Sequence, residues 1–270
     1  MTIPEEILNR KGVRKVADIP MEILQLLNEG KIATVNLTEW LALDQRILLK
    51  NFLKTIAKLE WLADIEAAID AQKKPSANNN AKTIGLAFGQ LLNQESLDEL
   101  MGGHASDVVR CWYCWASSIQ QDETADLLKA MKPFAADPHF GIREVVIFAT
   151  KERLAGDLPL AISILAEWTR SADENVRRYA AEVLRPIGVW TKKIAAFQED
   201  PSLALPVLTP LQADPSKYVQ NAVANWLNDA SKSQPEWVKA LCQDWEASSN
   251  DKATSYIIKR ALRTINKSAT

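Results

Sequence analysis

The stretch Asp214–Asp229 reads DPSKYVQNAVANWLND, and its pattern recurs along the second half of the chain. Asp214 is expected to cap a helix N-terminus. Pro215 would be the first residue of that helix, a position where the N–H that proline lacks has no partner within the helix. Apolar residues then recur at helical spacing and form one face: Val219, Ala222, Val223, Trp226, Leu227 and Ala230. Four-residue steps give a polar stripe that ends in a carboxylate: Lys217, Asn221, Asn225 and Asp229. The stretch therefore predicts an amphipathic helix with an acid at the edge of its apolar face.

A phrase of this kind begins every second predicted helix from residue 106 onward. A capping residue, a branched apolar residue and a basic or polar residue recur in that order. The closing residues are separated by 33, 34 and 43 positions, and Lys259 follows 39 positions later: Arg110, Arg143, Arg177 and Gln220. Such a period predicts an α-solenoid of HEAT-like helical repeats, with a concave binding face lined by the second helix of each pair.

The rest of the chain shows neither strand alternation nor a hairpin signal, so the predicted fold class is all-α. The 270 residues, 47% of them hydrophobic, are enough to bury a large core. The polar, turn-rich segment 73–80 is expected to be a linker. It would separate an N-terminal helical cap, residues 1–72, packed on the solenoid, from the repeat domain at residues 83–270.

Composition narrows the function classes. No apolar run reaches 18 residues and the N-terminus lacks signal-peptide features, so we expect a cytoplasmic protein without a membrane partner. Cys111 and Cys114 could bind zinc with His104 or Cys242, or they could be two core thiols on one helix, which we favour. We expect no cofactor and no metal. A net charge of −2 means that any polyanion site must be a local basic patch.

Carboxylates with aromatic and arginine neighbours are the chemistry that remains, because no phosphate loop or nucleophile–histidine set is present. Glu182 is flanked at helical spacing by Arg178 and Arg185, which an ordinary exposed ion pair would also explain. Trp190 is predicted in the turn after this helix. Trp226 precedes Asp229 by one turn, so both tryptophans could face a ligand as well as a core.

The run from residue 140 to 245 carries several ordered motifs: Gly141-Ile142-Arg143-Glu144, Asn175-Val176-Arg177-Arg178, Arg185-Pro186, Leu205-Pro206-Val207-Leu208, Asp214-Pro215-Ser216-Lys217 and Val223-Ala224-Asn225-Trp226. This run resembles the bacterial DNA alkylation repair glycosylases built from HEAT-like repeats, and is closer to the AlkC than to the AlkD type. The resemblance implies removal of cationic N3- or N7-alkylated bases from DNA. Glu182 and Asp229 match its acids, whereas Ile147 fills a position where the AlkC pattern has a further acid.

The resemblance and the helix pattern together assign roles to individual residues. Asp229 and Glu182 are the expected catalytic residues, and Trp190, Trp226 and Glu144 are expected at the substrate. The cations at or after the starts of the inner helices are expected to contact DNA: Arg143, Lys151, Arg177, Arg178, Arg185, Lys192, Lys193, Lys217 and Lys232. The implied partner is double-stranded DNA with alkylated bases, bound by a bacterial, nucleoid-associated monomer.

A non-catalytic scaffold that binds damaged DNA or a protein on the same face is the alternative function. Ile147 and the negative net charge favour the scaffold. The pair of acids beside Trp190 and Trp226 favours the enzyme.

Overall fold

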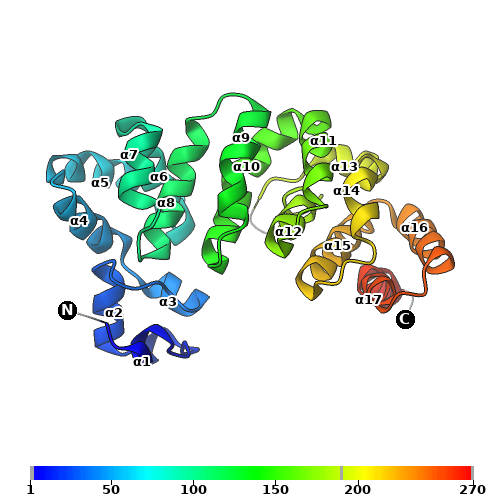
Figure 1. Cartoon of the computed structure of the whole chain (residues 1–270), viewed down its shortest axis with the longest axis horizontal. Coiled ribbons are helices and arrows are strands. Elements are labelled where there is room, and N and C mark those ends of the chain that lie inside the picture. Colours follow the sequence, from blue (N-terminus) through cyan, green and yellow to red (C-terminus); the bar gives the residue numbers. More distant parts are fainter. Residues whose placement is uncertain (1–2, 189–190, 269–270) are drawn as a thin grey trace. The chain divides into compact units, whose positions relative to one another are not determined.

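A computed structural model describes residues 3–188 and 191–268, and these residues form helices joined by short turns, without a strand (Figure 1). This confirms the predicted all-α class. The α-helices are α1 (Glu5–Leu8), α2 (Met21–Asn28), α3 (Leu37–Ala42), α4 (Gln45–Thr55), α5 (Leu62–Asp70), α6 (Ala77–Leu91), α7 (Gln94–Met101), α8 (Asp107–Ile119), α9 (Thr124–Ala135), α10 (Phe140–Gly156), α11 (Leu158–Trp168), α12 (Glu174–Val183), α13 (Ala195–Glu199), α14 (Leu205–Leu208), α15 (Lys217–Ala230), α16 (Pro235–Ser248), α17 (Lys252–Ala261) and α18 (Arg263–Ser268). Short 3₁₀ helices occupy Val16–Asp18, Leu59–Trp61, Pro201–Ala204 and Thr209–Leu211. Within the described ranges, no helix has the length and apolar character needed to cross a membrane.

The chain divides into two compact units. Unit 1 contains Met1–Gln121 and His139–Val146, and unit 2 contains Asp122–Pro138 and Ile147–Thr270. Residues on both sides of the 73–80 segment belong to unit 1. Part of that segment is helical, because α6 begins at Ala77 and the Ser76 side chain caps it by accepting from the Asn79 N–H. The expected division into residues 1–72 and 83–270 is therefore not the grouping of the structure.

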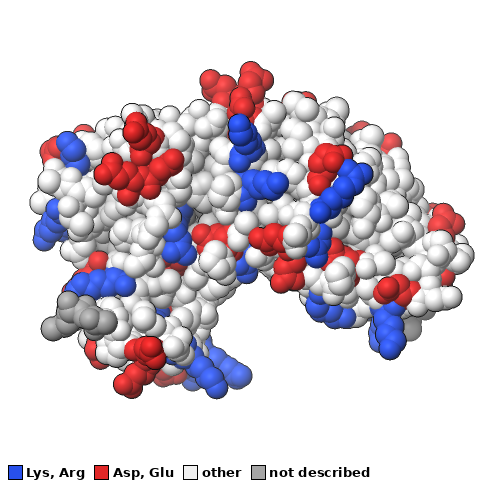
Figure 2. Space-filling view, in the orientation of Figure 1, with Lys and Arg blue, Asp and Glu red and all other residues white. Residues whose placement is uncertain are grey.

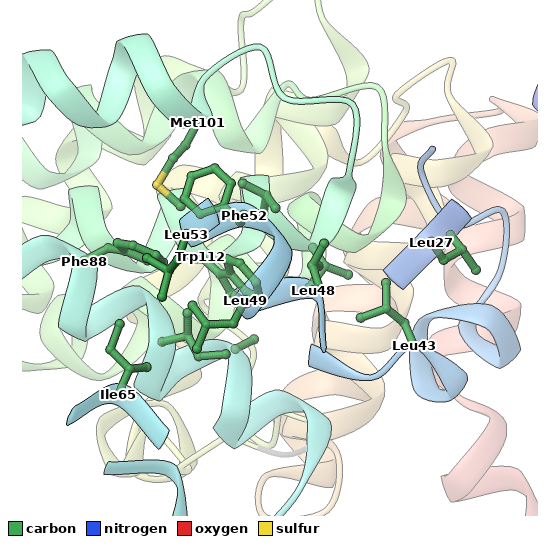
Figure 3. Close-up of a cluster of buried hydrophobic side chains, with 14 of the residues drawn as sticks. Leu27, Leu43, Leu48, Leu49, Phe52, Leu53, Ile65, Phe88, Met101 and Trp112 are labelled. Carbon is green, nitrogen blue, oxygen red and sulfur yellow. The ribbon is translucent and has the colours of Figure 1, made fainter. Parts of the chain in front are cut away.

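The core of unit 1 is built by large apolar side chains from α4, α6 and α8 (Figure 3). The Phe52 ring meets the Phe88 ring edge-on, with 5.5 Å between centroids, and Phe88 stacks on Trp112 at 6.1 Å. Gly85 allows α6 to approach α8 closely, since a Cβ at this position would lie 2.6 Å from the Trp112 carbonyl oxygen. The absence of a side chain at Gly85 thus lets the backbone of α6 lie close to the backbone of α8.

The last residue of the repeated sequence phrase has the same structural role in both units. In three of the phrases the closing side chain donates a hydrogen bond to a backbone carbonyl six residues earlier. Arg110 donates to the His104 carbonyl at 2.8 Å, Arg177 to Ser171 at 2.9 Å and Gln220 to Asp214 at 2.8 Å. We call this bond the clasp. It satisfies a carbonyl in the turn before α8, α12 and α15, which would otherwise be left without a partner on burial.

The helix that carries Asp229 begins later than the sequence predicts. Helix α15 starts at Lys217, and its N-cap is Ser216, whose side chain accepts from the Tyr218 N–H. Asp214 accepts instead from the Ser216 N–H at 2.8 Å and from two nitrogens of Arg177 at 2.7 and 3.0 Å. The expected cap at Asp214 is therefore wrong, because this carboxylate binds the preceding repeat.

The apolar faces of the inner helices of unit 2 are as expected. All six predicted residues of α15, from Val219 to Ala230, are buried. The apolar residues that recur at helical spacing along and just after α12 are buried too: Val176, Tyr179, Ala180, Val183 and Leu184. Helices α12, α15 and α17 pack against one another in chain order (Figure 1). Ser233 and Glu236 have the spacing from which a capping box is expected. That expectation is wrong, because the hydroxyl of Ser233 donates to the Ala230 carbonyl and α16 starts at Pro235 without a side-chain cap.

Candidate functional site

The C-terminal end of α12 is held by one side chain from α10 and one from α15. Trp226 donates its indole N–H to the Leu184 carbonyl at 2.8 Å, and Lys151 donates from Nζ to the Arg185 carbonyl at 2.6 Å. These carbonyls belong to the helix end, where no intrahelical donor is available. The backbone that carries Glu182 and Arg185 is therefore fixed from two neighbouring helices.

This position of Trp226 corrects its expected role at a substrate. The side chain is fully buried, its ring packs edge-on against Phe197 at 5.5 Å, and its only polar atom is bonded to the backbone. A tryptophan at helical spacing on an apolar face is first a core residue. Trp226 stabilises the backbone that carries the site, and its side chain has no surface exposed to a ligand.

Arg185 brings the two predicted acids onto one guanidinium group. Its Nη1 lies 2.7 Å from Glu182 Oε1, while its Nη2 and Nε lie 2.7 and 2.8 Å from Asp229 Oδ2. Lys232 binds the other oxygen of Asp229 at 3.0 Å. We call Lys151, Glu182, Arg185, Asp229 and Lys232 the Arg185 cluster. The pairing is shielded rather than superficial, because the side chains of Arg185, Glu182 and Asp229 are 12%, 13% and 5% exposed.

The electrostatics of the cluster follow from this shielding. Burial lowers the pKa of Lys151 to about 8, and the charge of Arg185 acts in the same direction, against the opposing effect of Glu182 and Asp229. Burial also acts to lower the pKa of Arg185, but Glu182 and Asp229 outweigh it and the pKa is raised. Arg263 is close enough for the same charges to shift its pKa, and burial lowers it. Four cations thus lie within electrostatic reach of two carboxylates, so these six groups together are positive although the chain is negative overall.

The carboxylate of Asp229 has a structural explanation as well as a chemical one. It lies in the last turn of α15, where an acid opposes the helix dipole. An acid at this position therefore needs a compensating positive charge. In the structure Arg185 and Lys232 supply the compensation directly.

The remaining polar stripe of α15 faces other side chains. Asn221 accepts from the Tyr256 hydroxyl at 2.9 Å, and Asn225 accepts from Arg263 at 3.0 Å. Lys217 lies over the Tyr256 ring. Tyr256 and Arg263, on α17 and α18, did not emerge from the sequence as site residues, because the last repeat lacks the full phrase that marked the others.

Several cations expected to contact phosphate have internal partners. Lys151 is 3% exposed and Arg178 is 6% exposed, with its guanidinium 4.8 Å from the centre of the Tyr218 ring. Arg177 is bound to Asp214, and this hydrogen bond raises its pKa. These three residues hold repeats together, so their expected role as phosphate contacts is corrected.

The other expected cations remain accessible to differing degrees. Lys193, Lys217 and Lys232 are exposed, and Lys192 is exposed and pairs with Glu152 of α10. Arg143 is half-buried. On the face in Figure 2, basic and acidic side chains alternate, so charge alone does not mark a binding surface there.

The remaining positions singled out in the sequence are Glu144, Ile147, Trp190 and the cysteines. Glu144 is half-buried in the first part of α10, and Ile147, where the AlkC pattern has an acid, is 6% exposed and belongs to the core. Trp190 lies outside the described residues. The three cysteines are buried as thiols, and among the described residues no group of metal-binding side chains gathers.

Comparison with known proteins gives a consistent result. Residues 146–265 match the family model of the DNA alkylation repair enzymes. The protein YhaZ of Bacillus subtilis (strain 168) is 40% identical over 120 residues, which are 44% of this chain and 33% of YhaZ. This chain therefore spans about a third of the length of YhaZ.

Solved structures share the fold over a longer range. The alkylpurine DNA glycosylase AlkC of Pseudomonas fluorescens, bound to DNA with an abasic site analog, has a TM-score of 0.67 at 23% identity, over 95% of this chain and 66% of AlkC. AlkD2 of Streptococcus mutans has a TM-score of 0.57 at 25% identity, over 75% of this chain and 96% of AlkD2. The fold is therefore that of the HEAT-like repeat glycosylases, and residues 146–265, which include the Arg185 cluster, match the family of DNA alkylation repair enzymes.

Proposed function

We propose that this protein is a DNA glycosylase that removes cationic N3- or N7-alkylated bases from double-stranded DNA. The observation that carries the proposal is the pairing of Glu182 and Asp229 on the guanidinium of Arg185, within the residues that match the repair-enzyme family. The two acids come from different helices and are 47 positions apart in the sequence. Their convergence at one partly shielded point is the arrangement that such chemistry requires.

The chemistry needs little more than negative charge and a placed water. An alkylated purine already carries a positive charge and is a good leaving group, so the main task is to stabilise a sugar with oxocarbenium character. A carboxylate ~4 Å from that cation contributes ~4 kcal/mol at an effective dielectric of ~20. That energy corresponds to a rate increase of roughly 10³. Arg185 offsets part of this field, but it also holds both acids in place before the substrate arrives.

Neutral bases should be poor substrates. Their departure needs a general acid. Lys151 is the group in the cluster with a pKa near neutrality, but its Nζ is bonded to a backbone carbonyl and buried. The proposed specificity for cationic lesions follows from this shortage of an accessible proton donor.

Binding to DNA is proposed from the cations that remain at the surface around the cluster. Lys193, Lys217 and Lys232 are exposed on or beside the helices that carry the acids. The local excess of positive charge suits a phosphate backbone, and AlkC, which shares the fold, was solved with DNA bound. If these side chains touch phosphates, the affinity should fall with salt by a log–log slope of about −0.9 per contact.

The decisive experiment is release of methylated bases from a methylated duplex by the purified protein, with unmethylated duplex as the control. Release in single-turnover conditions supports the proposal. The scaffold alternative is favoured by Ile147 and by the neutralisation of both acids through Arg185. Salt-dependent duplex binding without any base release at enzyme excess would refute the glycosylase and leave the scaffold.

A further inference from the structure

We propose that Lys151 is a positioning residue of this site, which sets the orientation of the Arg185 guanidinium and so the placement of both acids. The inference rests on the proposed function above. Lys151 makes this contact from the neighbouring helix α10, through the Arg185 carbonyl rather than through either carboxylate. It touches no substrate, and its effect reaches the acids through Arg185.

The geometry makes the contact specific. The Nζ–carbonyl distance is 2.6 Å, and the carbonyl belongs to the residue whose side chain holds Glu182 and Asp229. Because Arg185 follows the end of α12, no bond within the helix restrains its backbone carbonyl. A charged donor at a helix C-terminus is also favoured by the dipole. Rotation of this peptide would displace all three atoms of the guanidinium that contact the acids.

The space around Lys151 is fitted to a lysine. Its side chain is 3% exposed, and a Cβ on Gly188 would lie 2.6 Å from Nζ and 2.0 Å from Thr191 Oγ1. Glycine at this position therefore leaves room for the ammonium group below the chain that follows α12. A lysine that served only to bind phosphate would not be enclosed in this way.

Burying this charge is unfavourable for folding, which argues that it serves the site. Three charged groups influence the Lys151 ammonium: Glu182 on α12, Arg185 just after α12, and Asp229 on α15. Lys232 and Arg263 lie near the Asp229 carboxylate. With a pKa of about 8, the ammonium loses its charge in mildly alkaline solution. The contact to the carbonyl then weakens, because a charged donor forms the stronger bond.

The test compares Lys151→Met and Lys151→Gln with wild type in single-turnover excision of methylated bases. Lys151→Met should lower the excision rate roughly 10- to 100-fold, by analogy with the loss caused by removing a group that orients a metal ligand. Duplex affinity and its salt slope should stay at the wild-type value. Lys151→Gln, which keeps a donor for the carbonyl, should recover part of the rate. Lys129→Met, at an exposed lysine of α9, is the matched control and should excise like wild type.

A pH series separates positioning from a general loss of structure. Wild-type excision should fall as pH rises through about 8, whereas both Lys151 variants should lack this step. If Lys151→Met excised bases at the wild-type rate, this inference would be overturned and the proposed function would stand. A salt slope reduced by about 0.9 would overturn it too, by making Lys151 a phosphate contact. If wild type excises nothing, the proposed function falls and this inference with it.

Discussion

The buried ammonium group of Lys151 should make the stability of the protein depend on pH. Its pKa is about 8 in the folded chain and 10.5 when exposed, as in the unfolded chain. Between these values the unfolded chain binds more protons, so the free energy of unfolding should rise with pH across this window. Below pH 8 both states are protonated and the whole penalty for burying the charge is present.

The size of the effect follows from the shift. A difference of 2.5 pKa units, at 1.36 kcal/mol per unit, corresponds to about 3 kcal/mol at pH 7.5. At pH 9.5 the folded lysine is largely neutral, and about 1 kcal/mol of the penalty remains. Wild type should therefore gain about 2 kcal/mol relative to Lys151→Met between the two pH values.

Urea unfolding followed by tryptophan fluorescence measures this difference. The comparison between wild type and Lys151→Met cancels all other groups that titrate in the same range. It also cancels the cost of the Arg185 carbonyl that loses its donor in the variant, since that cost does not depend on pH. Equal changes with pH in the two proteins, or a relative loss in wild type, would refute the burial of a charged Lys151.

Three further substitutions test separate parts of the structure. Asp229→Asn should lower base excision by roughly two to three orders of magnitude. The control is Asp214→Asn, at another carboxylate bound to an arginine, which should lower stability but leave excision unchanged. Equal excision by the two variants would refute a catalytic Asp229. Arg177→Met should cost about 3–5 kcal/mol in urea unfolding, because Asp214 stays buried without its partner, whereas the exposed Arg170→Met should cost at most about 1 kcal/mol. Trp226→Phe should lower stability by about 1–3 kcal/mol through the carbonyl it leaves unbonded, and a melting temperature equal to wild type would contradict that bond.

The sequence predicted those features that depend on local periodicity. The buried faces of α12 and α15 repeat every three or four residues, so Tyr179 and Val223 could be assigned to the core from spacing alone. The ion pair of Glu182 with Arg185, three positions apart on one helix, was predictable for the same reason.

Contacts between repeats could not be read in this way. Arg185 and Asp229 are 44 residues apart, and nothing in the spacing of either helix says that their side chains meet. A lysine on a helix ordinarily faces water, so nothing in the sequence indicates that Lys151 is buried. Its burial depends on the space beside Gly188, which belongs to a different segment of the chain. Trp226 was placed correctly on its helix, but whether its indole faced a ligand or a backbone carbonyl depended on α12.

The bond between Arg177 and Asp214 has a consequence for shortened forms of the protein. These residues come from consecutive repeats, so each partner is supplied by a different segment of chain. A protein cut just before Asp214 would keep α12 intact but leave the guanidinium of Arg177 with only the two turn carbonyls that it already binds. Because each repeat of a solenoid is stabilised by its neighbours, the damage from such a truncation would extend one repeat upstream of the cut. Deletion end points in this chain should therefore be chosen by where these partners lie and not by where helices end.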